Sequence, residues 1–276
     1  MKIYHLTNAV IIENENGQLF SKAIADWDEY INRDDLHSFL RAEISRAMPV
    51  DELDADALLH PVGKQEVWAA GVTYLRSRDA RKEESKESGG ATFYDLVYNA
   101  ERPEIFFKAT AQRVVGHGGK VRIRKDSTWS VPEPELTLAI TSSGKIVGYT
   151  IGNDMSSRSI EGENPLYLPQ AKIFEGCASI GPCLYVPAAP IPGDTTISID
   201  ISRSGKSHYN DSVAISQMKR GHQELVDFLY RECDFPYGCF LMTGTCMVPP
   251  NDFTLQSGDV IRISIDHIGT LINIVA

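Results

Sequence analysis

The sequence of 276 residues predicts a mainly β protein, in which a mixed β-roll or sandwich follows a small α+β unit. Two segments, 195–202 and 259–265, alternate polar and apolar residues with the period of two that half-buried strands show. Residues 1–60 instead combine a strand pair with a long helical stretch. A chain of this length fits one large or two ordinary domains. We therefore predict two units, 1–60 and 61–276.

The N-terminal unit begins with the alternation typical of two strands between residues 3 and 19, joined by a turn at 15–17. Helical spacing follows over 23–48, and the polar segment 32–35 divides it into two candidate helices. Residues 59–62 are a connector, because the residue before a proline is pushed out of the helical region.

The larger unit consists of short strands and loops with two helices. Its expected strands are 105–108, 135–140, 145–151, 195–202 and 259–265. The second and third of these form a hairpin across Ser142-Ser143-Gly144. Its expected helices are a charged one over 76–88, ended by the segment 89–92, and one over 212–231 with Leu225, Phe228 and Leu229 on a shared face.

The composition is that of a globular protein, with 42% hydrophobic and 23% charged residues and a net charge of -10. Such acidity argues against nucleic-acid and anionic-membrane partners, which need clustered cations. The five cysteines are odd in number and form no Cys-x-x-Cys pair, so we expect reduced thiols. No signal peptide opens the chain and no apolar run approaches the ~20 residues of a membrane span. We expect a cytoplasmic protein.

The densest chemical signal is Pro132-Glu133-Pro134-Glu135, followed by Asp154 after the next strand. On an extended chain, positions i and i+2 point to the same face, so Glu133 and Glu135 project side by side. The prolines favour that extended form. Asp154, at the expected end of the hairpin's second strand, adds a third carboxylate.

Three clustered carboxylates repel one another unless a cation neutralises them. An all-oxygen set with open positions suits Mg²⁺, with Ca²⁺ or Mn²⁺ as alternatives. The competing interpretation is that Glu133 and Glu135 are solvated residues of an exposed edge and Asp154 a turn former. The residues alone leave both interpretations open.

Several blocks in order along the chain carry a family resemblance: WAAGVTY (68–74), PEIFFK (103–108), PEPEL (132–136), GYTIGND (148–154), SSR (156–158), AKIFEGCASIGP (171–182), MTGT (242–245) and SGDVIRISIDHIGTLIN (257–273). Together they cover most of residues 65–275, and they resemble the fumarylacetoacetate hydrolase superfamily. The resemblance implies a mixed β-roll, usually in a homodimer, with Glu133, Glu135 and Asp154 on Mg²⁺. It also implies that Lys172 sits by the metal and helps to hold the substrate's oxygens, with a surface lysine as the alternative. Lys108 is a weaker candidate for the same surroundings, and Thr245 of the MTGT block is a candidate substrate contact.

One departure from the family pattern concerns a histidine that activates water in its hydrolases. Ser77 or a neighbour stands at that place, and residues 73–81 contain no histidine. The segment TYLRSRDAR instead resembles the branch of 2-keto-3-deoxy-D-arabinonate dehydratase, in which Glu104 matches a glutamate placed to move protons. Arg76, Arg78 and Arg81 offer cations near the mouth of the site, although for at least two of them a charged helix face paired with Glu83, Glu84 and Glu87 is the simpler interpretation.

The predicted function is a Mg²⁺-dependent dehydration of a sugar-derived 2-keto-3-deoxy acid, giving 2-oxoglutarate semialdehyde. Glu104 is the candidate base and Lys172 the candidate cation for the developing negative charge. Arg76, Ser77, Lys108 and Thr245 are the candidate substrate contacts. C–C hydrolysis of a 3-acylpyruvate or fumarylacetoacetate-type substrate is the first alternative, and a non-catalytic 2-keto-acid-binding protein is the second.

Overall fold

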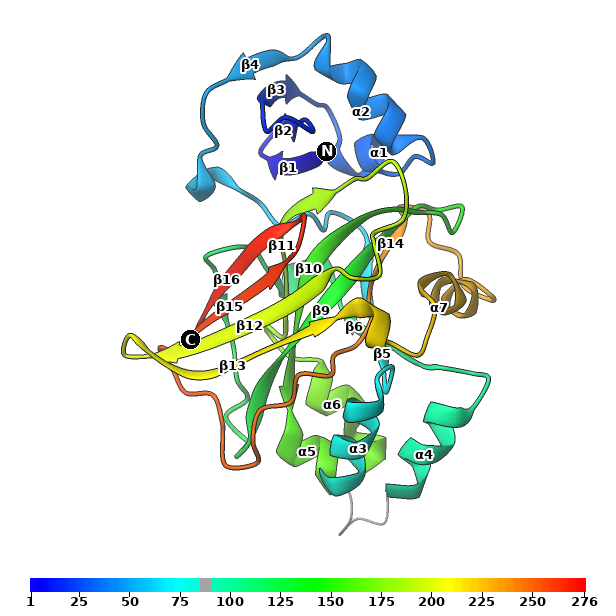
Figure 1. The fold of residues 1–276 in the computed structure, drawn as a ribbon, viewed down its shortest axis with the longest axis vertical. Coiled ribbons are helices and arrows are strands. Elements are labelled where there is room, and N and C mark those ends of the chain that lie inside the picture. Colours follow the sequence, from blue (N-terminus) through cyan, green and yellow to red (C-terminus); the bar gives the residue numbers. More distant parts are fainter. Residues whose placement is uncertain (85–90) are drawn as a thin grey trace.

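A computed structural model describes residues 1–84 and 91–276 and contains two β-sheets (Figure 1). The larger sheet has the strand order β4-β3-β2-β1-β11-β10-β9-β14-β5-β6, with β7 paired to β11. The smaller sheet has the order β13-β12-β15-β16-β8. Most neighbouring strands are antiparallel, but β14 runs parallel to β5, β7 to β11 and β8 to β16. The prediction of a mainly β protein with mixed sheets is confirmed.

The strands of the larger sheet are β1 (Lys2–Leu6), β2 (Ala9–Glu13), β3 (Leu19–Ala23), β4 (Met48–Val50), β5 (Glu66–Gly71), β6 (Glu104–Ala109), β7 (Val114–Val115), β9 (Ser130–Ile140), β10 (Ile146–Ser157), β11 (Ala178–Tyr185) and β14 (Cys239–Met242). Those of the smaller sheet are β8 (Lys120–Val121), β12 (Thr196–Arg203), β13 (Lys206–Ala214), β15 (Val260–Ile265) and β16 (Gly269–Val275). The helices are α1 (Trp27–Ile31), α2 (Leu36–Ile44), α3 (Leu75–Glu84), α4 (Ala91–Asn99), α5 (Arg158–Glu163), α6 (Leu168–Lys172) and α7 (His222–Leu229). Short 3₁₀ turns lie at Ala55–Ala57, Ala111–Arg113, Pro165–Tyr167 and Ile215–Gln217.

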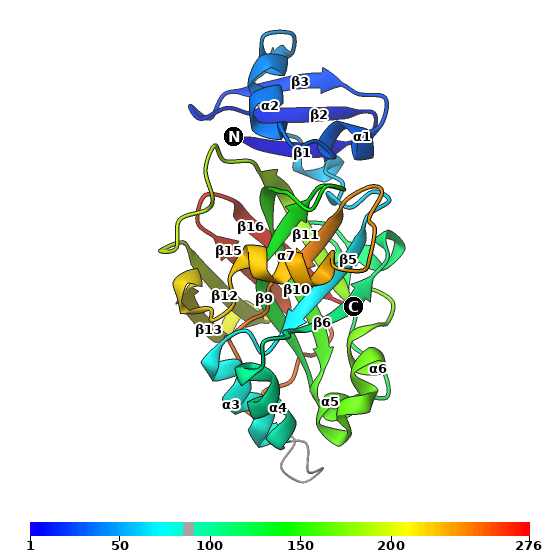
Figure 2. The same cartoon turned by 90° about the vertical axis from the view of Figure 1, so that its right-hand side faces the viewer.

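The two ends of the molecule are built differently. Strands β1 to β4 with α1 and α2 form one end of the long axis, and α3 to α6 gather at the opposite end (Figures 1 and 2). The N-terminal strands are not a separate sheet, because β1 pairs with β11 at Lys2↔Tyr185 and Ile3↔Leu184. The division at residue 60 therefore stays a prediction, while the hydrogen bonding of the sheet continues across it. None of the helices in the described part of the chain is long and apolar enough to cross a membrane.

The long hairpin of β9 and β10 is the centre of the molecule. Every residue of β9 is buried, so the strand is covered on both faces. One face carries Leu136 and Leu138, which pack in one core with residues of β12 and β15 such as Ile199 and Ile263. The alternate residues of β9, among them Glu133 and Glu135, face away from the smaller sheet. Helices α5 and α6 contact β9, β10 and β6 and close that side at the end of the hairpin.

Most predicted elements are confirmed, including the hairpin, the strands at 105–108, 195–202 and 259–265, and the break between two N-terminal helices at 32–35. The helix expected over 212–231 is wrong in its first half. Residues up to Ala214 continue β13, and the helix begins only at His222, after Gly221. Residues 91–92, expected to break a helix, instead begin α4. The expected helical residues 85–88 and the start of that break, 89–90, lie outside the described residues.

Candidate metal centre and its surroundings

Three carboxylates meet on one face of the β9–β10 hairpin. Asp154 lies directly opposite Glu133 in the antiparallel register, and Glu135 is two residues further along β9. One oxygen of each lies within 4.8 Å of the others, and the three residues are 5%, 1% and 0% exposed for Glu133, Glu135 and Asp154. The expected convergence is confirmed, but Asp154 lies inside β10, which runs on to Ser157, rather than at its end. Because all three residues are buried, the alternative that Glu133 and Glu135 are solvated residues of an exposed edge is wrong.

The residue opposite Glu135 explains how the strands approach here. That position is Gly152, and a Cβ built on it would lie 2.3 Å from the Thr137 hydroxyl oxygen. A side chain there would therefore push β9 and β10 apart. The glycine keeps Glu135 close to the other two carboxylates.

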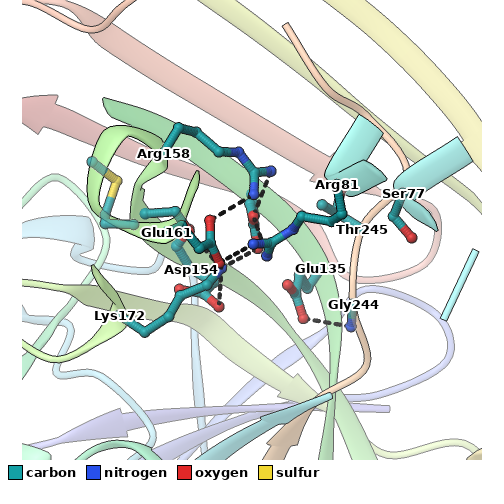
Figure 3. Close-up of polar contacts among 12 residues, drawn as sticks. Ser77, Arg81, Glu135, Asp154, Arg158, Glu161, Lys172, Gly244 and Thr245 are labelled. Atoms are coloured by element: carbon teal, nitrogen blue, oxygen red, sulfur yellow. Dashed lines mark hydrogen bonds and ion pairs between the residues drawn. The ribbon is translucent and has the colours of Figure 1, made fainter. Parts of the chain in front are cut away.

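Cations surround Glu133. Lys172 Nζ donates to Oε2 at 2.7 Å, while Arg158 Nη2 lies 2.7 Å and Arg81 Nη2 3.7 Å from Oε1. Figure 3 shows these side chains converging from α3, α5 and α6 on the strand residues. Burial by itself would raise the pKa of Glu133, but the three cations outweigh it and lower the pKa. Glu133 is therefore ionised.

Two lysines contact Asp154. Lys108 Nζ lies 2.5 Å from Oδ1, and Lys172 Nζ lies 3.3 Å from Oδ2. Lys172 also donates to Ser156 Oγ at 2.7 Å, and Lys108 donates to the Met155 carbonyl at 3.0 Å. Burial by itself would lower the pKa of Lys172, but Asp154, Glu133 and Glu161 raise it. Lys172 is thus a buried, charged group between carboxylates, not a surface lysine.

Glu135 has different surroundings. Its Oε2 accepts a hydrogen bond from the Gly244 amide at 2.5 Å (Figure 3). Burial, together with the negative charges of Asp154 and Glu133, raises the pKa of Glu135 well above its ordinary value. A divalent cation among the three carboxylates would reverse that repulsion, and an all-oxygen donor set is what Mg²⁺ prefers. The donor set therefore fits a hard divalent metal ion.

Two cavities adjoin the carboxylates. The inner one, of about 20 Å³, is lined by Glu133, Asp154, Lys172 and both arginines, with Ser77 and Thr245 on its wall. That volume holds about one water molecule or ion. The outer one, of about 550 Å³, is lined by residues of α4, of β6 and of the segment from α5 to α6. Only the outer cavity has room for the carbon chain of a small acid.

Two further acids line the outer cavity and contact residues that line the inner one, since Glu104 lies against Gly71 and Glu161 pairs with Arg81. Glu104 is partly buried, and its carboxylate lies against Gly71, where a Cβ would be 2.1 Å from its Oε2. Burial raises the pKa of Glu104, while Arg81 opposes the shift. Glu161 is 1% exposed and pairs with Arg158, Arg81 and Lys172, which hold its pKa below its ordinary value although burial would raise it.

The candidate substrate contacts divide into two groups. Ser77 and Thr245 line the inner cavity. Lys108 does not line it, but contacts Asp154, which does. The structure does not bring Arg76 to the cavity: its side chain is 57% exposed and pairs with Asp211 of β13 at 2.7 Å. Arg78 is also directed away from the cavity: it lies against α4 and pairs with Asp79 and Asp95. These pairs differ from the glutamates expected as partners, of which Glu87 lies outside the described residues.

Sequence reasoning did not single out Arg158 or Glu161. It set Ser156 aside because no Gly-x-Ser-x-Gly elbow surrounds it, and it did not distinguish Arg81 from the neighbouring arginines. Arg81 faces inward because it follows Ser77 by four residues, which places both on one side of α3. That spacing was the available signal. Among the described residues that line the two cavities there is no histidine.

Comparisons with known proteins agree with this geometry. The family described as fumarylacetoacetate (FAA) hydrolase C-terminal matches residues 67–276. A probable 2-keto-3-deoxyxylonate dehydratase of Haloferax volcanii is 50% identical over 214 residues, covering 77% of this chain and 73% of that protein. A 2-dehydro-3-deoxy-D-arabinonate dehydratase of Saccharolobus solfataricus is 45% identical over 215 residues, which cover 77% of this chain and 72% of that protein.

A solved structure extends the likeness to the whole chain. It is a 2-keto-3-deoxy-D-arabinonate dehydratase complexed with magnesium and 2,5-dioxopentanoate. It superposes with a TM-score of 0.82 at 33% identity and covers 100% of this chain and 98% of its own. From the family match and these relatives, the chain belongs to the fumarylacetoacetate hydrolase family.

Proposed function

We propose that this protein is a Mg²⁺-dependent dehydratase of a sugar-derived 2-keto-3-deoxy acid of the 2-keto-3-deoxyarabinonate type. The observation that carries the proposal is the buried carboxylate triad near a fourth carboxylate, Glu104, with cations around the triad and no histidine among the described lining residues. Two relatives at 50% and 45% identity carry the names of such dehydratases.

The proposed reaction balances as the loss of one water. A proton leaves C3 and the hydroxyl leaves C4, which creates a C3–C4 double bond. The O–H hydrogen and one C–H hydrogen of the C5 carbinol then move to C3 and C4, leaving an aldehyde at C5. The product is 2-oxoglutarate semialdehyde, which is the 2,5-dioxopentanoate bound in the related structure.

Glu133, Glu135 and Asp154 would hold the metal ion. When bound, Mg²⁺ supplies Lewis-acid stabilisation of negative charge on the oxygens of a 2-keto acid. The buried ammonium of Lys172, which already contacts Glu133 and Asp154, adds a fixed positive charge next to those oxygens. Lys108 fixes Asp154 from the other side and so sets its orientation.

Glu104 is the proposed base for the C3 proton. It lines the outer cavity and its carboxylate lies against Gly71 of the inner one, where a chain that extends from the inner cavity would pass it. Because burial raises its pKa, it is a stronger base than an exposed glutamate. Ser77 and Thr245 line the inner cavity with hydroxyl groups and are the proposed substrate contacts.

The decisive experiment is a parallel assay of the purified protein, stripped with chelator and then given Mg²⁺. The substrates are 2-keto-3-deoxyarabinonate and acetylpyruvate. We expect Mg²⁺-dependent formation of the semialdehyde from the first. Release of pyruvate and acetate from the second alone would establish C–C hydrolysis instead, and turnover of neither would leave a 2-keto-acid-binding protein.

We also infer a cytoplasmic homodimer. All five cysteines are free thiols, which suits a reducing compartment. Leu96, at the outer cavity, and Leu166, beside it in the chain segment between α5 and α6, are 66% and 83% exposed, and a second copy of the chain would cover such apolar side chains. Sedimentation equilibrium is the test, with a mass near 61 kDa expected for two chains of 30.6 kDa.

A further inference from the structure

Glu161 forms ion pairs with both arginines of the inner cavity, Arg81 and Arg158. It lies one helical turn after Arg158 in α5, whose Nη1 is 2.8 Å from Oε2. Its other oxygen contacts Arg81 Nη1 from α3 and lies 3.6 Å from Lys172 Nζ. Figure 3 shows the guanidinium groups of Arg81 and Arg158 close to the Glu161 carboxylate. The role of Glu161 goes beyond packing, because a neutral residue could fill the same space without neutralising the arginines.

The charges of the site point to the charge of its substrate. Among the described residues, and with an ionised base, five carboxylates (Glu104, Glu133, Glu135, Asp154 and Glu161) and four cations (Lys108, Lys172, Arg81 and Arg158) lie around the inner cavity. Arg102 lines the outer cavity but is exposed, so water screens its charge. The set is one negative charge in excess, and a divalent metal ion turns this into one positive charge in excess. A monoanion neutralises that charge, whereas a dianion leaves an uncompensated buried negative charge, which is costly.

The shape of the site places the tail of the substrate against Glu161. The inner cavity of about 20 Å³ holds little more than the metal ion and the groups on it, so a five-carbon chain must extend toward the cavity of about 550 Å³. Glu104 and Glu161 line that larger cavity, together with the exposed Arg102. Carboxylates accept hydrogen bonds from hydroxyl groups, but they repel another carboxylate.

We propose that Glu161 is a specificity-determining residue that restricts this site to monoanionic 2-keto acids and excludes 2-keto dicarboxylates. It acts by neutralising Arg81 and Arg158, the two buried arginines that line the inner cavity, which could otherwise bind a distal carboxylate in bidentate fashion. The inference rests on the proposed function and adds the charge class of the substrate to it. Without the charge of Glu161, the metal-loaded site carries two excess positive charges and suits a dianion.

The test compares two five-carbon ligands that differ only at C5, 2-oxopentanoate with a methyl group and 2-oxoglutarate with a carboxylate. Their binding to the Mg²⁺-loaded protein is measured by calorimetry, so that the readout is independent of turnover. We expect the wild-type protein to prefer 2-oxopentanoate by about tenfold or more, because like charges brought together at a binding site are strongly discriminated. Glu161→Gln, which keeps the shape, should shift the ratio toward 2-oxoglutarate by about tenfold.

Two further variants make the result specific to the charge of Glu161. Glu163→Gln makes the same change at an exposed position of the same helix and should leave the ratio as in the wild type. Glu161→Asp retains the charge and should retain the preference for 2-oxopentanoate. Circular dichroism establishes that each variant is folded.

The outcomes distinguish the inference about Glu161 from the proposed function. Equal binding of both ligands by the wild type overturns the inference, and that measurement needs no variant to fold. A folded Glu161→Gln protein with an unchanged ratio also overturns it. Absence of Mg²⁺-dependent binding of 2-oxopentanoate to the wild type overturns the proposed function instead, and the inference falls with it.

Discussion

Burial decides what the carboxylate of Glu104 is able to do. Its raised pKa means that the ionised, proton-accepting form is lost at a higher pH than for an exposed glutamate. We therefore expect kcat/KM, at saturating Mg²⁺, to fall as the pH drops through a value above 4.5 and to rise again with pH. Glu104→Gln should remove this acidic limb and lower the rate by about 10²- to 10⁴-fold while binding of 2-oxopentanoate persists.

The control for that variant is Glu101→Gln, an exposed glutamate three residues earlier. It should leave the pH profile in place. A Glu104→Gln enzyme that keeps both its rate and its acidic limb would show that the base is another residue.

The carboxylate of Glu133 is both a proposed metal ligand and the ion-pair partner of Lys172 and Arg158. Glu133→Ala removes one of three carboxylates and leaves Lys172 and Arg158 without one of their partners. We expect loss of Mg²⁺ binding by calorimetry together with loss of turnover, and a destabilisation of about 3–5 kcal/mol because buried cations lose their counter-ion. Glu163→Ala, at the exposed end of α5, is the matched control. Retention of metal binding and activity in Glu133→Ala would contradict the assignment of the ligands.

At the scale of elements, the hairpin of β9 and β10 holds the site together. Gly152→Ala would place a Cβ 2.3 Å from the buried Thr137 hydroxyl oxygen, and the two strands would have to separate where Glu135 lies. We expect a loss of about 1–3 kcal/mol in the free energy of unfolding and weaker Mg²⁺ binding. Gly193→Ala adds the same methyl group where the nearest atom is 3.7 Å away and should change neither quantity. Equal behaviour of the two variants would mean that the strand spacing does not set the metal site.

The elements also show where local sequence is informative. The hairpin was predictable because two strand-like runs, 135–140 and 145–151, and the Ser-Ser-Gly turn between them lie within about twenty residues. The helix at 212–231 was placed too early because the segment before Gly221 lacks a clear period of two. Its first residues, up to Ala214, are strand because β12 pairs with them across the sheet, and that pairing is a tertiary contact; a 3₁₀ turn at Ile215–Gln217 follows.

At the scale of the whole molecule, the N-terminal end and the rest of the chain share a sheet and a core. Strand β1 pairs with β11, and Ile3, Val10 and Leu40 pack in one cluster with Ile180, Leu184 and Phe240. We expect a single calorimetric unfolding transition whose calorimetric and van't Hoff enthalpies agree for the whole chain. Two separate transitions would favour an independent domain that ends near residue 60.

The sequence by itself determined the mainly β class and the hairpin, and it placed Glu133 and Glu135 on one face because side chains alternate along a strand. The family blocks, and not the residues alone, indicated that these two and Asp154 hold a metal ion. The same ordered blocks also pointed to Glu104 and Lys172. Only the tertiary structure decided that Arg81 and not Arg76 enters the site, and that Arg158 and Glu161 complete it. The physical reason is that charge neutralisation in a buried site depends on which helices pack over the strands, and residues from α3, α5 and α6 meet only after the sheet has formed.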